Sequence, residues 1–466
     1  MLLPVLLAGA LQWWVSARFT SQAICERIEA QRNCRASIGS ASVRLLGFPA
    51  RVEIRDVEIT PRDPGLKPAV AGETYIKAGH VMLEVNLLSL LLGELDVQRA
   101  LVSGVDMRTV KWAEGGNSLR LLLAAPGTPA LPPVEPLSLE DVDEIPVPAG
   151  EGPVGADRAW HLSELPVSAT LGEARISNAN WSIHNHRKGT TTQIKDCTVV
   201  LTDMKLDPAR PAAGGTAAVS VNTRLILGNE ALETRTVDFL IGLDGKYQLF
   251  NPQTGFLSND LDFALTLKKG SLLNRLPTLV KLNERLAKLK DSAGLDLSLP
   301  AEAMLLSDAV IRANLKDDVI RFQEDVLFPF DTWQLGLNRE SWLNSLTGEH
   351  EFNGKLTAGA ETSRKATAEI RAFLDKQSRE LTDFVFQTVV SKVVNPQGNV
   401  ELPFQSGGLI GRPDVMVSDA LGDALRKAAA ETGKDLIRDA LEGGNKIEGL
   451  IDSLRDRPEK PAKDDR

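Results

Sequence analysis

The sequence is poor in cysteine, and this excludes a disulfide-stabilised scaffold. There are three cysteines in 466 residues. Cys25 and Cys34 lie on an expected helix, at a separation whose rise of roughly 13 Å is too long for a disulfide. Cys197 falls on the apolar phase of an expected strand, which indicates a buried and inert thiol. Cysteine usage therefore leaves the redox compartment open.

Positive charge is also scarce relative to negative charge. The formal net charge is -9 and the pI is about 5.3. Proteins that bind nucleic acid neutralise phosphates with clustered Lys and Arg. We therefore expect no nucleic-acid partner.

Convincing catalytic motifs are missing. Gly150, Gly152 and Gly155 match G-x-G-x-x-G, but no strand precedes them and Pro153 interrupts them, so the dinucleotide-binding context is absent. No G-x-S-x-G nucleophile motif occurs. The sequence therefore predicts no catalytic residue and no cofactor.

A metal site finds little support either. His184 and His186 share one face of an expected strand and could form half of a site, but no third ligand lies nearby in the sequence. Trp181 and Ile183 take the opposite, apolar phase, so a solvated polar face is the favoured interpretation. A hydrolase that gathers these histidines and carboxylates is the least favoured function.

The one long apolar run lies at the N-terminus. It extends from Leu2 to Val15 and spans about 21 Å as a helix, against about 30 Å for a bilayer core. A membrane anchor and a signal peptide cleaved after Ala17 both fit this run. No Lys or Arg precedes Arg18, which weakens both interpretations.

Period-two alternation is the strongest pattern that is present. One face of two expected strands is apolar, and the intervening residues are mostly polar, which is typical of an antiparallel sheet with one wet face. The apolar residues are Val219, Val221, Leu225, Leu227, Leu261, Phe263, Leu265 and Leu267. A further strand, Ala309 to Leu315, carries Ala309 and Ile311 in the same phase.

Three local features refine this pattern. From Val81 to Gly104 the sequence predicts a strand, a leucine-rich helical turn and a second strand. Between Arg51 and Thr60 the apolar phase shifts by one residue, which predicts a β-bulge with an extra residue near Arg55 and Asp56. Asp244-Gly245 predicts a hairpin turn.

The coarse organisation follows from these patterns. Helices are expected at 18–35, 270–290, 365–394 and 420–454, and strands at 43–46, 51–60, 319–328, 352–358 and 399–405. We expect an anchor or signal segment at 1–17, a helix and strands at 18–123, and a Pro- and acid-rich disordered insertion at 124–158. An antiparallel sheet with two helical insertions is expected at 159–415, and helices with a charged tail at 416–466.

Two blocks of the sequence resemble the AsmA-like family of bacterial envelope proteins, of AsmA/TamB type. The first is the strand with its leucine-rich turn and Gly-Glu-Leu at 87–95, followed by the step at 102–106. The second is Leu402-Pro403-Phe404 with Gly407-Gly408 and Arg412-Pro413-Asp414. Between these blocks the resemblance is one of pattern.

The resemblance implies a mainly β protein with some α structure: an elongated, curled antiparallel sheet forming a groove or half-pipe, an N-terminal anchor helix and a few flanking helices. It further implies a single-pass inner-membrane protein, mostly periplasmic, that contributes to phospholipid transport or outer-membrane biogenesis. Membrane lipids and other envelope proteins are the implied partners. The ten alternating residues named above would then face acyl chains, although a sheet over a closed core, as in an envelope scaffold, has the same alternation.

Overall fold

The computed structural model describes residues 18–62, 74–112, 116–126, 161–186, 189–210, 215–229, 234–274, 279–284, 286–287, 302–377, 386, 390, 394–410 and 412–417. The described part is mainly β, with few helices and a mixed, unclosed sheet in which antiparallel pairing predominates. The chain divides into two compact units. The N-terminal unit comprises Met1–Ser271 with Arg312–Asp318, and the C-terminal unit comprises Leu272–Ile311 with Val319–Arg466.

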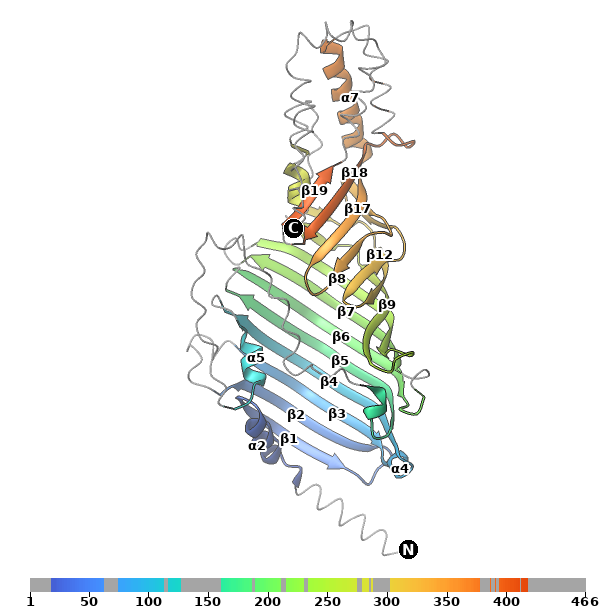
Figure 1. Cartoon of the computed structure of the whole chain (residues 1–466). Helices are drawn as coiled ribbons and strands as arrows, with labels where there is room; N and C mark the ends of the chain where they lie inside the picture. Colours follow the sequence, from blue (N-terminus) through green and yellow to red (C-terminus); the bar gives the residue numbers. More distant parts are fainter. Residues whose placement is uncertain are drawn as a thin grey trace, which may run out of the picture. The chain divides into compact units, whose positions relative to one another are not determined.

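Nine strands, most of them long, form the N-terminal unit (Figure 1). They are β1 (Cys34–Arg44), β2 (Ala50–Pro61), β3 (Tyr75–Asn86), β4 (Glu94–Lys111), β5 (Ser168–Asn185), β6 (Thr190–Leu206), β7 (Thr216–Asn229), β8 (Thr234–Phe250) and β9 (Leu257–Leu267). Each strand pairs with the next along the chain. Seven of these pairings are antiparallel, as predicted, and β4–β5 is parallel.

The parallel step has a cause in the sequence. Parallel neighbours need a crossover connection, whereas antiparallel neighbours are joined by short turns. The connection from β4 to β5 contains α5 (Ser118–Leu123), the short 3₁₀ helix η2 (Leu162–Glu164) and the expected Pro- and acid-rich insertion. That insertion lies outside the described residues from 127 onward.

The predicted helix after residue 18 is shorter than expected. α2 (Ser21–Gln31) begins after Thr20, whose hydroxyl accepts a hydrogen bond from the Ala23 amide. Because β1 already begins at Cys34, the helical spacing assumed for Cys25 and Cys34 is wrong. Both thiols are nevertheless free, and burial is the main cause that raises the pKa of each.

The predicted strand, turn and strand around residue 90 are confirmed. β3 ends at Asn86, whose side chain caps α4 (Leu87–Leu91), and β4 begins after Gly93. Gly93 has φ +81, which glycine adopts without a steric penalty.

A crease crosses β1 to β5 where the register aligns Gly39, Asp56, Gly79, Gly104 and Asn178. Three of these residues, Asp56, Gly104 and Asn178, have positive φ. This left-handed conformation suits Gly, Asn and Asp. The residue types at the crease therefore match its backbone.

The crease changes which alternate residues are apolar. In β2 the apolar phase moves from Val52 and Ile54 to Val57 and Ile59, as the sequence predicted. The predicted extra residue is wrong, because β2 keeps one register with β1 and β3 across Asp56. All three strands shift phase in the same row, so the left-handed backbone, rather than an insertion, accounts for the shift.

The apolar alternation of β7 and β8 continues without a phase shift. A bulge between β6 and β7 keeps their apolar residues on the same face as those of the creased strands. The β6–β7 register changes by one residue between Lys195 and Thr198, beside Asp196 with φ +51. The predicted hairpin at Asp244-Gly245 is wrong, since both residues lie inside β8. A Cβ on Gly245 would lie 2.5 Å from the Asp262 carbonyl oxygen, so glycine permits the close approach of β9.

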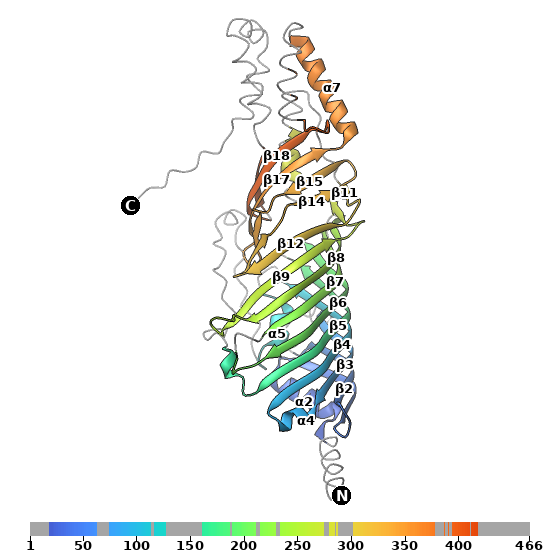
Figure 2. The ribbon, with the colours of Figure 1, turned by 90° about the vertical axis from the view of Figure 1, so that its right-hand side faces the viewer.

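The C-terminal unit is built of shorter strands around a packed core. Its strands are β10 (Leu272–Asn274), β11 (Glu302–Met304), β13 (Val319–Phe322), β14 (Val326–Pro329), β15 (Trp333–Leu337), β16 (Trp342–Asn344), β17 (Glu349–Ala358), β18 (Glu401–Leu409) and β19 (Arg412–Val417). The division between the units falls within β12 (Ala309–Lys316). The unit also contains α7 (Ala360–Gln377), shown with the strands in Figure 2. Phe328, Trp333, Leu356, Phe404 and Val415 are among its buried side chains.

Several predictions in this region need correction. The strand expected at 319–328 is two strands, β13 and β14. The helix expected from Gly270 begins later, because β10 occupies 272–274, and the described helical residues of this region start at 279. α7 begins earlier than its predicted start at Lys365. The helices expected at 420–454 and the anchor at 1–17 lie outside the described residues.

Candidate apolar binding surface

Three in-register rows of apolar residues cross the sheet of the N-terminal unit, and we call them lanes. Residues that pair across neighbouring strands point to the same face of a sheet. Lane 1 is Ala41, Ile54, Val81, Val102, Ile176, Val199, Val221, Leu243 and Leu265, one residue from each of β1 to β9. Lane 1 is therefore continuous across all nine strands.

Two further lanes run beside it. Lane 2 is Val43, Val52, Leu83, Ala100, Ala174, Leu201, Val219, Gly245 and Phe263. Lane 3, beyond the crease, is Ala36, Ile59, Ile76, Met107, Trp181, Ile194, Leu225 and Phe239. Because β1 to β6 shift phase at the crease, the lanes on both sides of it are apolar.

The lanes are only partly covered by protein, since Leu83 and Ile176 are exposed and the other members are half-buried. No member of any lane is buried, and Ile176, in the middle of lane 1, is 40% exposed. β5 and β6 are interior strands of the sheet, yet neither contains a buried residue. An interior strand of a closed core is expected to alternate buried and exposed residues. Ala217, Val237 and Leu267, in the same phase of β7, β8 and β9, are buried, so among the described residues the open part of this face is limited to the lanes.

The opposite face carries charge. Its in-register row beside lane 2 is Arg44, Arg51, Glu84, Arg99, Glu173, Thr202, Ala218, Lys246 and Asp262. Cross-strand pairs of opposite charge stabilise a wet sheet face. The two faces therefore differ sharply in chemistry.

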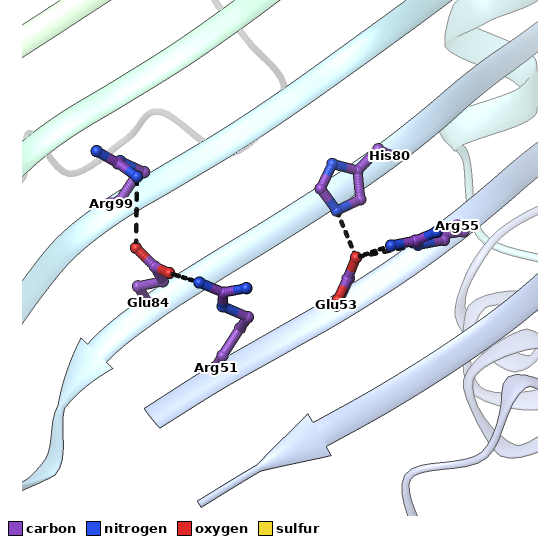
Figure 3. Close-up of polar contacts among 6 residues, drawn as sticks. All are labelled: Arg51, Glu53, Arg55, His80, Glu84 and Arg99. Atoms are coloured by element: carbon purple, nitrogen blue, oxygen red, sulfur yellow. Dashed lines mark hydrogen bonds and ion pairs between the residues drawn. The ribbon is translucent and has the colours of Figure 1, made fainter. Parts of the chain in front are cut away.

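Ion pairs organise this charged face (Figure 3). Glu84 lies between Arg51 and Arg99, with its Oε2 3.9 Å from Arg99 Nη1. Glu53 accepts hydrogen bonds from Arg55, one of them at 2.6 Å, and contacts His80 Nε2 at 3.0 Å. The hydrogen bonds from Arg55 are the main cause that lowers the pKa of Glu53. Charged side chains thus satisfy one another across the strands.

A bidentate pair continues the charged face beyond the crease. Arg224 Nε and Nη2 donate to the two Asp238 carboxylate oxygens at 2.6 and 2.7 Å. The hydrogen bonds to Asp238 are the main cause that raises the pKa of Arg224. Leu225 and Phe239, the next residue along each strand, belong to lane 3. Adjacent residues therefore project charge to one face and apolar surface to the other.

The structure places five of the ten predicted apolar residues in the lanes. Val221 and Leu265 lie in lane 1, Val219 and Phe263 in lane 2, and Leu225 in lane 3. Leu227 and Leu261 are half-buried on the same strands, and Leu267 is buried.

Ala309 and Ile311 belong to the C-terminal unit, where they are 1% and 9% exposed. They are not members of the lanes. Sequence reasoning did not include the lane members on β1 to β6 among the lipid-facing residues, although the alternation around Val81 and the phase shift in β2 were visible in the sequence. The signal that could have found them is the shared shift in several strands, each beside a Gly, Asn or Asp.

The histidines are dispersed. His184 pairs with Thr191 on β6, His80 contacts Glu53, and His161 packs edge-on against Phe256 with ring centroids 4.9 Å apart. His350 is buried, with its Nε2 2.8 Å from Ser406 Oγ. No cluster of His, Cys, Asp or Glu able to hold a metal ion occurs among the described residues.

No family model matches the chain, and no curated protein matches its sequence. Within the described ranges, no helix combines the length and apolar character needed to cross a bilayer.

Proposed function

We propose that the chain is a non-enzymatic, membrane-anchored envelope protein that shields lipid acyl chains on the lanes and contributes to phospholipid transport or outer-membrane biogenesis. The observation that carries this proposal is the continuity of lane 1 across nine strands without a single buried member. Large exposed apolar surfaces on proteins usually mark a binding site. The opposite face carries paired charges, among them the buried Glu84 and Asp238, so the sheet has one polar side and one side suited to hydrocarbon.

The dimensions of the lanes suit acyl chains. Strand spacing of about 4.8 Å makes a lane across nine strands roughly 38 Å long. One leaflet of a bilayer core is about 15 Å thick, so a lane exceeds the depth that one acyl chain fills. Each methylene removed from water contributes about 0.8 kcal/mol, so partial burial of a chain is enough for binding.

Placement in the envelope is the part of the proposal that rests on the resemblance to AsmA-like proteins. The first resembling block lies in α4 and β4, and the second lies in β18 and β19. On the basis of this resemblance, we also propose the curled groove, the inner-membrane anchor and the periplasmic location.

An envelope scaffold is the second candidate. The C-terminal unit, with its closed core, is the observation that favours it. In a scaffold, a partner protein would have to cover the lanes, because the described residues leave them open.

The test is native mass spectrometry of the full chain, purified from membranes in mild detergent, with lipid extraction. Val221→Asp places a charge in lane 1, and Ser220→Asp places the same charge on the opposite face of the same strand. We expect co-purifying phospholipid with the unchanged protein and with Ser220→Asp, and its loss with Val221→Asp. Circular dichroism checks that both variants fold.

Two outcomes would overturn lipid binding. Lipid retained by Val221→Asp would place it away from the lanes. A lipid-free protein that instead co-purifies with a partner released by Val221→Asp would support the scaffold.

A further inference from the structure

Apolar side chains project from the two strand connections at one end of the N-terminal unit. The residues are Leu46 and Phe48, between β1 and β2, and Leu88, Leu90 and Leu92, on α4 and its C-cap. Their exposed fractions are 57% and 81% for the first pair and 53%, 44% and 81% for the three leucines. We call this set the apolar tip. Figure 1 shows α4 at this end of the sheet.

The two connections are neighbours. Ala50, the first residue of β2, pairs with Val85, the penultimate residue of β3. Phe48 lies two residues before this pair and Leu87 two residues after it, so both connections leave the sheet at adjacent strand ends. The apolar tip is therefore one surface made of two segments.

α4 exposes two of its leucines, while Leu87 is half-buried like Ser89. A surface helix in water turns its leucines inward and its polar residues outward. In α4, Leu88 and Leu90 are exposed, whereas Ser89, its polar residue, is half-buried. Asn86 caps the helix, so the segment is built as a helix in this orientation. This arrangement suits an apolar exterior.

The charges behind the tip balance. At this end of the charged face, three arginines lie on β1, β2 and β4, and three acids lie on β3 and β4. The residues are Arg44, Arg51, Arg99, Glu84, Glu94 and Asp96. A strongly charged partner finds no complementary field here, whereas projecting leucines and a phenylalanine suit insertion into a lipid interface.

We propose that the apolar tip inserts into the interfacial region of a lipid bilayer. Apolar residues continue from the tip onto lane 2 through Leu83, four residues before Leu87 on the same chain segment. The tip would hold the side of the sheet next to lane 2 against the hydrocarbon. This inference stands whether or not the lanes bind lipid.

The experiment is hydrogen exchange, read by mass spectrometry, on the full chain with and without phosphatidylcholine vesicles. We expect vesicles to slow exchange in peptides covering 45–49 and 87–93. The turn around Leu346, which is 77% exposed in the C-terminal unit, serves as the internal control and should not change. Vesicle flotation gives the affinity at low and high salt.

The variant Leu88→Asp with Leu92→Asp should remove the protection of 87–93 and weaken vesicle affinity at least about tenfold. Leu346→Asp is the matched control and should leave both unchanged. Because the local charges balance, added salt should change the affinity of the unchanged protein little.

Vesicle-bound protein with no change in exchange at 87–93 would overturn the proposal, because another segment would then carry the attachment. Concentration-dependent self-association abolished by Leu92→Asp, without vesicle protection, would also overturn it and assign the tip to a second copy of the chain. Acyl-chain binding to the lanes does not enter either readout.

Discussion

The two units share the alternating strand pattern, but they differ in how deeply the apolar residues of that pattern are buried. In the C-terminal unit, β14 and β18 alternate buried and more exposed residues, and large side chains such as Trp333 and Phe404 are almost fully buried. In the N-terminal unit, β5 and β6 alternate in sequence, yet contain no buried residue. Alternation thus determines which residues share a face, while burial depends on what covers that face. Stability should follow burial and differ between the units.

The largest expected effect is the loss of stability when a large side chain is removed from the packed core of the C-terminal unit. Trp333 is 2% exposed and lies against Phe330, with ring centroids 4.2 Å apart. Trp333→Ala should lower the free energy of unfolding of the C-terminal unit by about 3–5 kcal/mol. Hydrogen exchange of the slowest amides in β17 and β18 measures this loss.

Ile176→Ala, in lane 1, is the matched comparison and should cost about 1 kcal/mol or less, read from the slowest amides of β5. A loss of several kcal/mol at Ile176 would show that the lanes are covered. The difference between the units would then disappear.

The next effect tests the crease. Gly104 has φ +64, a conformation that costs most residues about 1–2 kcal/mol. Gly104→Val should destabilise β3 and β4 by at least that amount, as measured by chemical denaturation and hydrogen exchange. Gly104→Asn should cost less, because Asn178 already adopts this conformation in the same row. Equal losses for Val and Asn would contradict the role of the left-handed backbone.

The stability of the two units should also differ in its dependence on pH. Burial is the main cause that lowers the pKa of His350 from its ordinary value of 6.5. The unfolded state then binds the proton more readily, so the C-terminal unit loses stability as pH falls below about 6.5 toward the folded pKa. Above that range this histidine contributes no pH dependence.

The measurement is the exchange of β17 amides across this pH range. His350→Asn removes the titrating group and should flatten the profile of the C-terminal unit. A profile that persists in this variant would assign the dependence to other groups.

The smallest effect lies on the charged face. Lys77 Nζ and Glu58 Oε1 are 3.1 Å apart, and both side chains are nearly half exposed. Exposed pairs of this kind contribute less than about 1 kcal/mol. Lys77→Met should therefore change the free energy of unfolding of the N-terminal unit little, by urea denaturation. A larger loss would show that the charged face, too, depends on close packing.

Much of the β architecture could be predicted because side-chain alternation is a local property. The apolar phases of β7 and β9 and the strand, turn and strand around α4 needed only neighbouring residues. The phase shift at Asp56 was also visible, but its cause was not. An inserted residue and a residue with left-handed backbone produce the same phase shift in the sequence of one strand. Only the register of β2 with β1 and β3 distinguishes the two causes.

The tertiary structure decided which strands pair and which apolar faces are buried. Asp244-Gly245 has the local chemistry of a turn, yet Gly245 serves the close approach of β9, a contact with a distant segment. Ala309 and Ile311 share the alternation of the lanes but are buried, because the C-terminal unit packs around them. The sequence by itself determined the apolar and charged faces of the strands, since these depend on residue order. Which apolar face stays open depends on long-range packing, and only the tertiary structure decided it.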